Sequence, residues 1–530
     1  MAIEITDYTF TPEGLAEISK YKYGRNWPLT YILQKNDKLY IGETTGGLGR
    51  LKNHFDSKIE FREGKVSLIT DSDFNKSSIL LFESLLIEYL LADEKYDITN
   101  QQLGIKHNFF NKHSFERKFE HLWDIYLLNG FVRRDLLNIK NLDIFKYSPY
   151  KSLTEEQDEI ASDIIKTIKQ NPDQQNIFLI NGGPGTGKSV LASYLAKEIA
   201  TSSLGNVALV IAMTSLRKTF KKVFNKIRGL KSSQVIGPNQ ISNNKYDILL
   251  IDEAHRLKQR INLTPGEYSA YDKENIRLGL DKEATQLDWV LNQAKNIILF
   301  FDENQTIRPS DVNINTIKTT FTKEYFLTSQ MRIINSNEFV DFVKDLFFGE
   351  LDDEYNIGDY QLNLFEDFDK FYSEHQKNES LFGLSRIVAG YAWEWVSKND
   401  ETKFDINLGS KSLKWNTTNS DWVNSQNASK EVGCIHTVQG YDLNYVNLII
   451  GSDITYNKSS KSIEINKQNY KDKAGKRSIS DEAVLKKYIQ NIYITLMTRG
   501  IRGANIYIVD ENFREYFQES MMKLNINIIK

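Results

Sequence analysis

The stretch from Ile177 to Leu191 constrains the fold of this chain more than any other. An apolar run passes into Asn-Gly-Gly-Pro-Gly-Thr-Gly-Lys-Ser and then into a helical pattern. In such a strand–loop–helix unit, small residues let backbone N–H groups point at phosphate oxygens, and the lysine reaches the terminal ones. The residues expected to line this phosphate cradle are Gly182, Gly183, Pro184, Gly185, Thr186, Gly187, Lys188 and Ser189. We therefore expect a nucleoside triphosphate such as ATP, with Mg²⁺ held by Ser189.

The composition of the whole chain describes a globular protein with several domains. Its 530 residues exceed what one hydrophobic core supports, so we expect about two to four domains. With 40% hydrophobic and 26% charged residues and no apolar run of about 18 residues, a membrane protein is excluded. Cys434 is the single cysteine, and the first residues lack the order of a signal peptide, so we expect a cytoplasmic protein. The net charge of −3 restricts nucleic-acid binding to local patches.

The first hundred residues carry polar side chains on a pattern of two short strands and two helices. The strands are expected within residues 30–41, and a glycine-rich loop leads from them into a helix. On this helix Arg50 and His54 stand four residues apart, so both can face one phosphate. The next helix, from about residue 77 to 91, is apolar nearly all round but carries Glu83. A buried carboxylate needs a cation, either an arginine or a metal ion.

Tyr31, Tyr40-Ile41-Gly42, Arg50, His54, Glu83 and Asn100 follow one another along this segment. Their order and spacing resemble the GIY-YIG endonuclease domain, which we expect over residues 1–135. The first motif of that family begins with glycine, whereas this chain has Leu29-Thr30-Tyr31. Both a cutting domain and an inactive, binding-only domain therefore stay open.

The resemblance implies a metal-dependent hydrolysis of phosphodiesters. Glu83 would bind one divalent metal, Mg²⁺ or Mn²⁺, and Arg50 would contact the phosphate. Tyr31 and Tyr40 would be the base that activates water and its support. The supporting polar residues would be His54 and Asn100.

We expect a linker at residues 136–151, where a polar, proline-marked stretch separates two composition patterns. The next domain is expected to begin at residue 152. Thr154 and Gln157 have the spacing of a helix capping box. Because a phosphate cradle follows, Gln157 also resembles the glutamine of the helicase Q motif, which reads the adenine edge. The two interpretations are compatible.

Three further apolar runs end in polar residues, which is typical of parallel strands that present a ligand site at one edge. After the first run, Thr214 and Ser215 are expected to contact a nucleic-acid backbone. After the second, Asp252 would orient Mg²⁺ and Glu253 would polarise the attacking water. After the third, Gln305 would sense the γ-phosphate. The runs span residues 206–213, 246–251 and 296–301.

Together these elements predict one RecA-like lobe over residues 152–330 and a second over residues 331–530. Arg332 and Arg499 resemble the two arginines that superfamily 1 helicases direct at the γ-phosphate. The segment 433–442 resembles the motif that couples nucleic acid to nucleotide. Its candidate residues are His436 and Thr437 for nucleic acid and Gly440 for nucleotide.

The motif order over residues 152–510 is similar to a superfamily 1 helicase core. The segments 385–390, 436–440 and 498–500 are most similar to the Schlafen group 3 helicase-like family of bacteria. The fold class expected is thus α/β, a small nuclease-like domain followed by two parallel-sheet lobes. A basic stretch over residues 458–477 either holds phosphates or is a solvated loop.

The function expected is an ATP-driven nuclease-helicase that acts on DNA, by analogy in defence against foreign DNA or in repair. The alternatives left open are a nucleotide-gated nucleic-acid-binding switch and an RNA-directed version. A homo-oligomer and a partner protein are equally compatible with the sequence.

Overall fold

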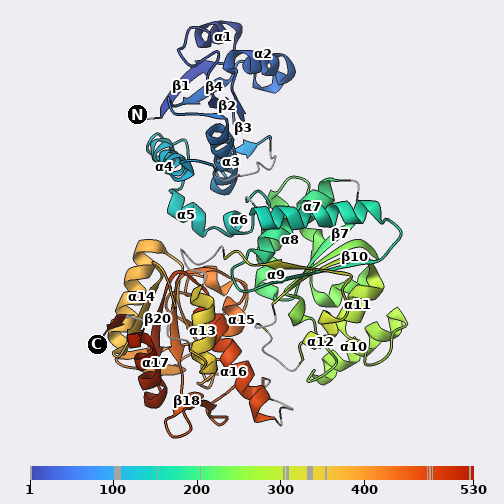
Figure 1. Ribbon diagram of the computed structural model, residues 1–530, viewed down its shortest axis with the longest axis vertical. Helices are drawn as coiled ribbons and strands as arrows, with labels where there is room; N and C mark the ends of the chain where they lie inside the picture. The colour runs from blue at the N-terminus through green and yellow to red at the C-terminus, as the bar shows by residue number, and fades with distance from the viewer. Residues whose placement is uncertain are drawn as a thin grey trace. The chain divides into compact units, whose positions relative to one another are not determined.

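The computed structural model describes residues 3–100, 109–151, 153–202, 204–302, 305, 310–330, 338–351, 355–473, 475–476, 479, 481–523 and 527–529. The chain divides into two compact units, Met1–Glu159 and Ile160–Lys530 (Figure 1). Unit 1 and unit 2 are described separately below. Within unit 2, the first lobe comprises residues 160–330 and the second lobe comprises the residues after them.

Unit 1 is built on one five-stranded sheet in the order β1-β4-β2-β3-β5. β1, β4, β2 and β3 pair antiparallel, and β5 joins β3 in parallel. The two strands expected within residues 30–41 are confirmed as the β2–β3 hairpin, with Asn36 in its turn at φ 54°. The strands are β1 (Glu4–Thr9), β2 (Leu29–Lys35), β3 (Lys38–Thr44), β4 (Lys65–Thr70) and β5 (Asp97–Ile98).

The long helix α3 packs on this sheet and on the helices that follow it. Asn75 and Ser78 form a capping box at its N-terminus, which satisfies two of the first backbone N–H groups. Leu86 and most of its neighbours are buried, as the apolar sequence predicts. The helices of unit 1 are α1 (Pro12–Ile18), α2 (Gly47–Ser57), α3 (Lys76–Asp93), α4 (Lys112–Leu128), α5 (Leu136–Asn141) and α6 (Asp143–Lys146), and α7 (Glu155–Gln170) runs into unit 2.

The residues 136–151, expected to be a linker, contain α5 and α6. Ile139 and Phe145 from these two helices are buried in the same core as α3. Apolar side chains at these two positions explain why the stretch folds onto unit 1 instead of running as irregular chain.

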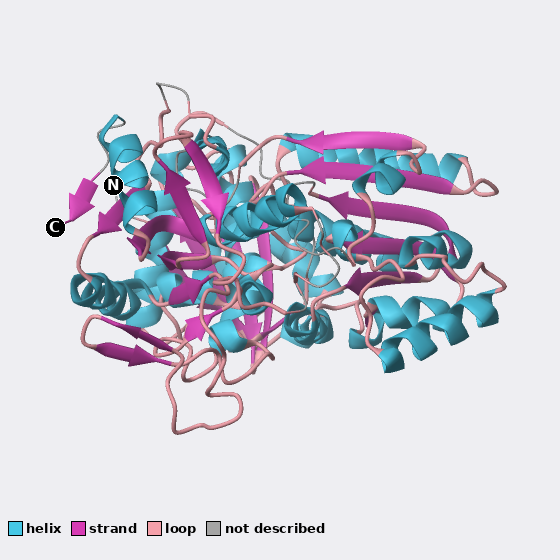
Figure 2. Ribbon diagram, turned by 90° about the horizontal axis from the view of Figure 1, so that it is seen from below, coloured by secondary structure: helices cyan, strands magenta, loops and turns pink. Residues whose placement is uncertain are grey.

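The first lobe of unit 2 is a six-stranded sheet in the order β11-β6-β10-β9-β7-β8, and every pairing is parallel. Figure 2 shows these strands side by side with helices on both faces. Such burial on two sides explains the uninterrupted apolar runs. The strands are β6 (Asn176–Gly182), β7 (Val207–Ile211), β8 (Val235–Ile236), β9 (Tyr246–Asp252), β10 (Ala294–Phe301) and β11 (Lys323–Leu327), and the helices are α8 (Lys188–Thr201), α9 (Thr214–Lys226), α10 (Pro265–Leu278), α11 (Gln286–Gln293) and α12 (Ile314–Lys318).

The second lobe repeats this plan with the strand order β16-β13-β17-β20-β12-β21, again all parallel. Two RecA-like parallel-sheet lobes are therefore present, as expected. The sheet strands are β12 (Gln361–Phe365), β13 (Ser385–Ala389), β16 (Val432–Gly433), β17 (Leu443–Ile450), β20 (Gly500–Ile508) and β21 (Asn527–Ile529), and the helices are α13 (Glu338–Phe348), α14 (Phe368–Phe382), α15 (Ile435–Val438), α16 (Glu482–Met497) and α17 (Glu511–Lys523).

Two hairpins complete the second lobe: β14 (Ile406–Leu408) with β15 (Lys411–Leu413), and β18 (Ile454–Asn457) with β19 (Ser462–Ile465). The second hairpin begins the basic stretch noted in the sequence. There Lys458 pairs with Glu515, while Arg477 lies outside the described residues. Across the part of the chain that the structure describes, no helix is both long and apolar enough to cross a bilayer.

Candidate nucleotide and metal sites

The glycine loop after β6 wraps around the ammonium of Lys188. Gly185 and Gly187 have φ values of 84° and 80°, which glycine adopts without the strain a side chain would bring. The Lys188 Nζ donates to the carbonyl oxygens of Gly182 at 2.5 Å and Gly183 at 2.9 Å. It also lies 3.6 Å from Asp302 Oδ2. Phosphate oxygens are stronger acceptors than carbonyls, so this buried ammonium suits the terminal phosphates of a nucleotide.

The Mg²⁺ residues expected from the sequence are adjacent in space. The Ser189 Oγ, in the first turn of α8, donates to Asp252 Oδ2 at 2.9 Å. The other carboxylate oxygen of Asp252 is buried and has no hydrogen-bond partner among the described residues. Burial, and then the neighbouring Glu253, raise the pKa of Asp252 to about 7. A hydroxyl and a buried carboxylate with a spare oxygen fit Mg²⁺, which keeps waters and phosphate oxygens as its other ligands.

Glu253 follows directly, with its backbone in the left-handed region at φ 55°. Its Oε2 lies 2.9 Å from the Nε2 of His255, outside hydrogen-bond geometry. Burial alone would raise the pKa of Glu253, but the nearby His255, Lys188 and Arg499 hold it below its ordinary value. The carboxylate is therefore ionised at neutral pH, the form that can accept a proton or orient water.

Gln305 connects the two lobes at this edge. Its Nε2 donates to Asp302 Oδ2 at 2.7 Å, so it reaches the residue that faces Lys188. Its Oε1 accepts from Arg499 Nη2 and from Gln439 Nε2, both at 3.2 Å. All of these groups are buried. A continuous path of contacts thus runs from the phosphate cradle to the second lobe.

Gln439, Arg256 and Gln330 belong to this region although the sequence did not single them out. Arg256 donates to the Gln439 Oε1, and its other nitrogen lies 3.7 Å from Asp311 Oδ2. Gln330 Nε2 donates to the carbonyl of Pro184 in the cradle at 2.7 Å. Gln439 lies between Thr437 and Gly440, which the sequence did single out, so its position in that segment could have identified it.

A cavity of about 550 Å³ adjoins the first two glycines of the cradle. It opens beside the ends of β6, β10 and β11 and borders α13 of the second lobe. Its lining includes Asn181, Gly182, Gly183, Asp302, Phe326 and Lys344.

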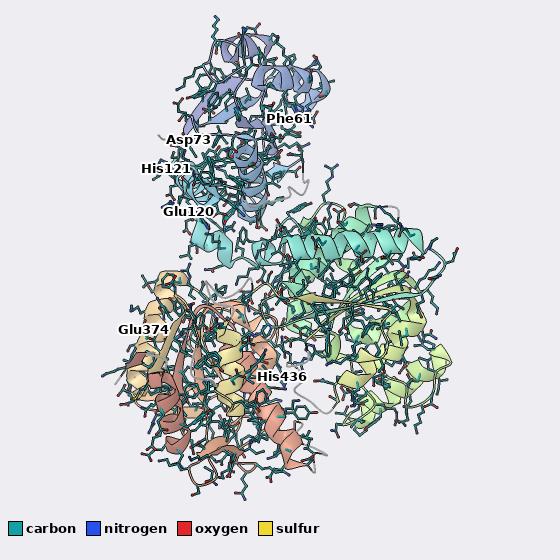
Figure 3. The ribbon with its side chains drawn as sticks, viewed as in Figure 1. Phe61, Asp73, Glu120, His121, Glu374 and His436 are labelled. Atoms are coloured by element: carbon teal, nitrogen blue, oxygen red, sulfur yellow. The ribbon has the colours of Figure 1, made fainter. Side chains whose placement is uncertain are left out.

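The remaining expected residues of unit 2 differ in accessibility. Thr214 is exposed, whereas the Ser215 and Thr437 side chains are buried and Thr437 Oγ1 donates to the carbonyl of Cys434 at 2.9 Å. His436 is half-buried and lies on the side of the second lobe that borders the first (Figure 3). Gly440 has φ 86°, and a Cβ there would lie 2.8 Å from Leu216. Arg332 lies outside the described residues.

Gln157, which was expected to read adenine, belongs to unit 1. Its Oε1 accepts from the backbone N–H of Thr154, and its own N–H donates to Thr154 Oγ1, both at 3.2 Å. The capping box expected from the sequence is therefore confirmed.

In unit 1, the aromatic residues of the hairpin meet α2. The ring centres of Tyr31 and Tyr40 lie 5.8 Å and 5.0 Å from that of His54. Gly42 faces Tyr31, because a Cβ there would lie 2.4 Å from the tyrosine Oη. The Tyr31 Oη and His54 Nε2 are buried and have no hydrogen bond among the residues described.

The charges around this cluster include Arg50, Lys58 and Glu83. Burial, and then Tyr40, raise the pKa of Tyr31 well above its ordinary value, and Arg50 opposes them. Burial, and then Arg50, lower the pKa of His54 to about 4. Burial, and then Glu43, raise the pKa of Glu83 to about 7. Glu83 is half-buried, and the nearby Lys76 and Arg50 oppose this rise in its pKa.

Asn100 holds the edge of the sheet. Its Oδ1 accepts from the backbone N–H of Ile41 at 2.9 Å, and its Nδ2 donates to the Ile41 carbonyl. It thereby fixes β3, and with it Tyr40. In the described residues no group of three or more His, Cys, Asp or Glu side chains is arranged to hold a metal ion.

The fold and the cradle define unit 2 as a P-loop NTPase with two RecA-like lobes. Residues 175–510, more than half of the chain, match the family model described as Schlafen group 3, DNA/RNA helicase domain. The chain belongs to this family, and these residues form its P-loop helicase domain.

Individual relatives are distant. The Saccharomyces cerevisiae protein YPL245W, whose name describes it as uncharacterised, is 22% identical over 426 residues, which cover 69% of this chain and 90% of that protein. The Candida albicans Pif1 helicase is 11% identical with a TM-score of 0.29, over 69% of this chain and 99% of that one. Bacteroides Pif1 bound to single-stranded DNA is 12% identical with a TM-score of 0.28, over 69% and 93%.

Proposed function

We propose that this protein is an ATP-driven nucleic-acid motor whose N-terminal unit cuts DNA with a divalent metal. The contact that supports the motor is Gln305, which joins Asp302 beside Lys188 to Arg499 of the second lobe. A change at the γ-phosphate can thereby alter how the lobes engage, which is how hydrolysis becomes movement.

In this proposal each residue of unit 2 has one task. Lys188 binds the terminal phosphates, and Ser189 with Asp252 holds Mg²⁺, which neutralises charge on the phosphates. Glu253 orients the attacking water and accepts its proton. Arg499 and Arg332 contact the γ-phosphate from the second lobe when the lobes close. Thr214 and His436 would face the nucleic acid, and Gly440 would lie near the nucleotide.

The observation that supports the nuclease is the raised pKa of the half-buried Glu83, close to the buried Tyr31 Oη and His54 Nε2, which have no hydrogen bond among the described residues. Polar groups are seldom left so in a folded core unless a ligand completes them. We assign the metal, Mg²⁺ or Mn²⁺, to Glu83 and the scissile phosphate to Arg50. Tyr31 and Tyr40 would position the attacking water, with His54 and Asn100 in support, in the manner of a GIY-YIG domain. A role in defence or repair stays an analogy.

The test is cleavage of labelled single-stranded, duplex and forked DNA and of RNA, with Mg²⁺ or Mn²⁺ and with or without ATP. Wild type is compared with Glu83→Ala and Lys188→Ala. We expect Glu83→Ala to abolish cleavage, and Lys188→Ala to abolish ATPase activity and change the cleavage pattern. If the wild-type protein shows no cleavage and no nucleic-acid-stimulated ATPase activity, the proposal is overturned.

A second candidate is a nucleotide-gated switch in which unit 1 binds nucleic acid without cutting. The observation in its favour is the raised pKa of the fully buried Tyr31, which makes its phenol a poor base at neutral pH. Intact ATPase activity without cleavage of any of the DNA or RNA substrates would favour this candidate over the nuclease.

A further inference from the structure

Helix α9 and the loop after it carry only positively charged side chains. Residues 214–231 hold seven basic side chains and no acidic one, although the chain as a whole has a net charge of −3. This helix begins with Thr214, the exposed member of the expected nucleic-acid pair. The basic residues are Arg217, Lys218, Lys221, Lys222, Lys226, Arg228 and Lys231.

Three of these lysines form a row on the outer face of α9. Lys218, Lys222 and Lys226 are exposed and stand four residues apart, so successive Cα atoms rise by about 6 Å along the helix. The opposite face, with Phe220 and Phe224, is buried in the first lobe. The row is therefore fixed to the lobe that holds the phosphate cradle.

The oxygen atoms that meet this row come from the second lobe. Lys218 Nζ donates to Ser420 Oγ at 2.8 Å, and Lys222 Nζ lies 3.0 Å from Asp421 Oδ2. Beneath them, Thr219 Oγ1 lies 3.1 Å from Tyr441 Oη, which donates to Asp421 Oδ1 at 3.4 Å. Asp421 is held in the left-handed region at φ 56°.

We propose that Lys218, Lys222 and Lys226 of α9 bind the phosphodiester backbone of a nucleic-acid strand. In the absence of a strand, Asp421 forms an ion pair with Lys222, and a bound strand displaces Asp421 from it. This rests on the proposed motor function and names a surface and a competitor for it. Carboxylate and phosphate oxygens are both anionic acceptors, so Lys222 cannot give the same geometry to both. Binding of a strand therefore releases one contact between the lobes and prepares them to move.

The experiment measures binding of labelled single-stranded DNA and RNA to the full-length protein by fluorescence anisotropy at several salt concentrations. We expect Lys218→Ala/Lys222→Ala to weaken binding about 10-fold at low salt, and to lower the slope of log K against log salt by about 0.7 per lost phosphate contact. The control is Lys377→Ala, an exposed helical lysine that pairs with Glu374 at 3.1 Å (Glu374 is labelled in Figure 3). It should bind as wild type does.

Asp421→Asn separates competition from simple attraction, because asparagine keeps the left-handed backbone and loses the charge. We expect it to bind strands about 3- to 10-fold more tightly than wild type, and we expect this gain to vanish when Lys222→Ala is also present. If Asp421→Asn gains affinity for only one of the two polymers, that polymer is the ligand of the lysine row. If it gains equally for DNA and RNA, the phosphate groups that both share determine binding.

An unchanged affinity and salt slope in the double lysine variant would overturn the inference, as would equal or weaker binding by Asp421→Asn. ATPase activity measured in the same samples separates the two proposals. If wild type hydrolyses ATP and binds strands while the α9 variants bind equally well, only this inference fails. If wild type does neither, the motor proposal fails with it.

Discussion

At the scale of single residues, Glu83 is a half-buried carboxylate that lowers the stability of unit 1 and is suited to bind a ligand. It lies on a mostly apolar helix, and burial, and then Glu43, raise its pKa to about 7 although Lys76 and Arg50 act in the opposite direction. A carboxylate whose pKa is raised in this way costs stability at neutral pH, because its charged form is poorly solvated. A site kept at such a cost is typical of ligand binding.

Replacing Glu83 with Gln removes the charge and keeps the shape. Above pH 7 we expect the metal-free variant to be more stable than wild type, on the order of 1 kcal/mol, since the desolvated charge is gone. We also expect Mn²⁺ to raise the Tm of wild type and not of the variant. Calorimetry measures both. The control is Glu60→Gln at an exposed position, and an equal Mn²⁺ shift in Glu83→Gln would contradict the assignment.

His54 makes the stability of unit 1 dependent on pH. Its pKa is lowered from 6.5 to about 4 in the folded state, first by burial and then by Arg50 and Lys58. The unfolded chain therefore binds the proton first, and stability falls as the pH drops from about 6.5 towards 4. We expect His54→Gln to remove on the order of 1 kcal/mol of this loss at pH 5, measured by denaturant melts at pH 5 and 7.5. Parallel pH profiles for the two proteins would contradict this.

Among the elements, α3 organises unit 1. It packs on β2 and β3 and also on α4, α5 and α6, so residues beyond the sheet depend on it. The hairpin that carries Tyr31 and Tyr40 is held between this helix and α2. The placement of the cluster is therefore a property of helix packing as well as of the hairpin itself.

Leu86 lies fully buried at the centre of this packing. We expect Leu86→Ala to destabilise unit 1 by about 2–4 kcal/mol, because it leaves a cavity that the surrounding helices cannot fill. Thermal unfolding should show this as a shift of one transition, with the transition of unit 2 unchanged. Leu128→Ala on α4 is the control, since Leu128 is 86% exposed and should shift nothing.

At the scale of the whole molecule, polar contacts join the two lobes of unit 2. The buried contacts of Gln305 and the exposed contacts of α9 involve different residues of the two lobes. The first set would respond to nucleotide and the second to nucleic acid. A motor needs both responses to act on one relative movement.

Removing the central contact should separate binding from coupling. We expect Gln305→Ala to bind a fluorescent ATP analogue within about two-fold of wild type, and to lose about 10-fold of its nucleic-acid-stimulated ATPase rate. Gln376→Ala, at an exposed position on α14, is the matched control. Full stimulation in Gln305→Ala would show that coupling runs elsewhere.

Local sequence patterns predicted the strands and loops that carry the site, but not the hydrogen-bond partners of the site residues. The glycine cradle, the strand before Asp252 and the β2–β3 hairpin each depend on neighbours in sequence, and each formed as expected. Asn100 was named only as a supporting residue, because its bond to Ile41 spans residues far apart in the chain. Arg256 and Gln439 were missed for the same reason.

The sequence by itself determined that this chain has a phosphate cradle, parallel-sheet lobes and a carboxylate on an apolar helix, because backbone preference and hydrophobic periodicity act over short distances. Only the tertiary structure decided the strand orders, the contact of Gln305 with Arg499 and the pairing of Lys222 with Asp421. These depend on which surfaces meet after the chain has folded. Packing over long sequence separations sets that outcome, and no local pattern encodes it.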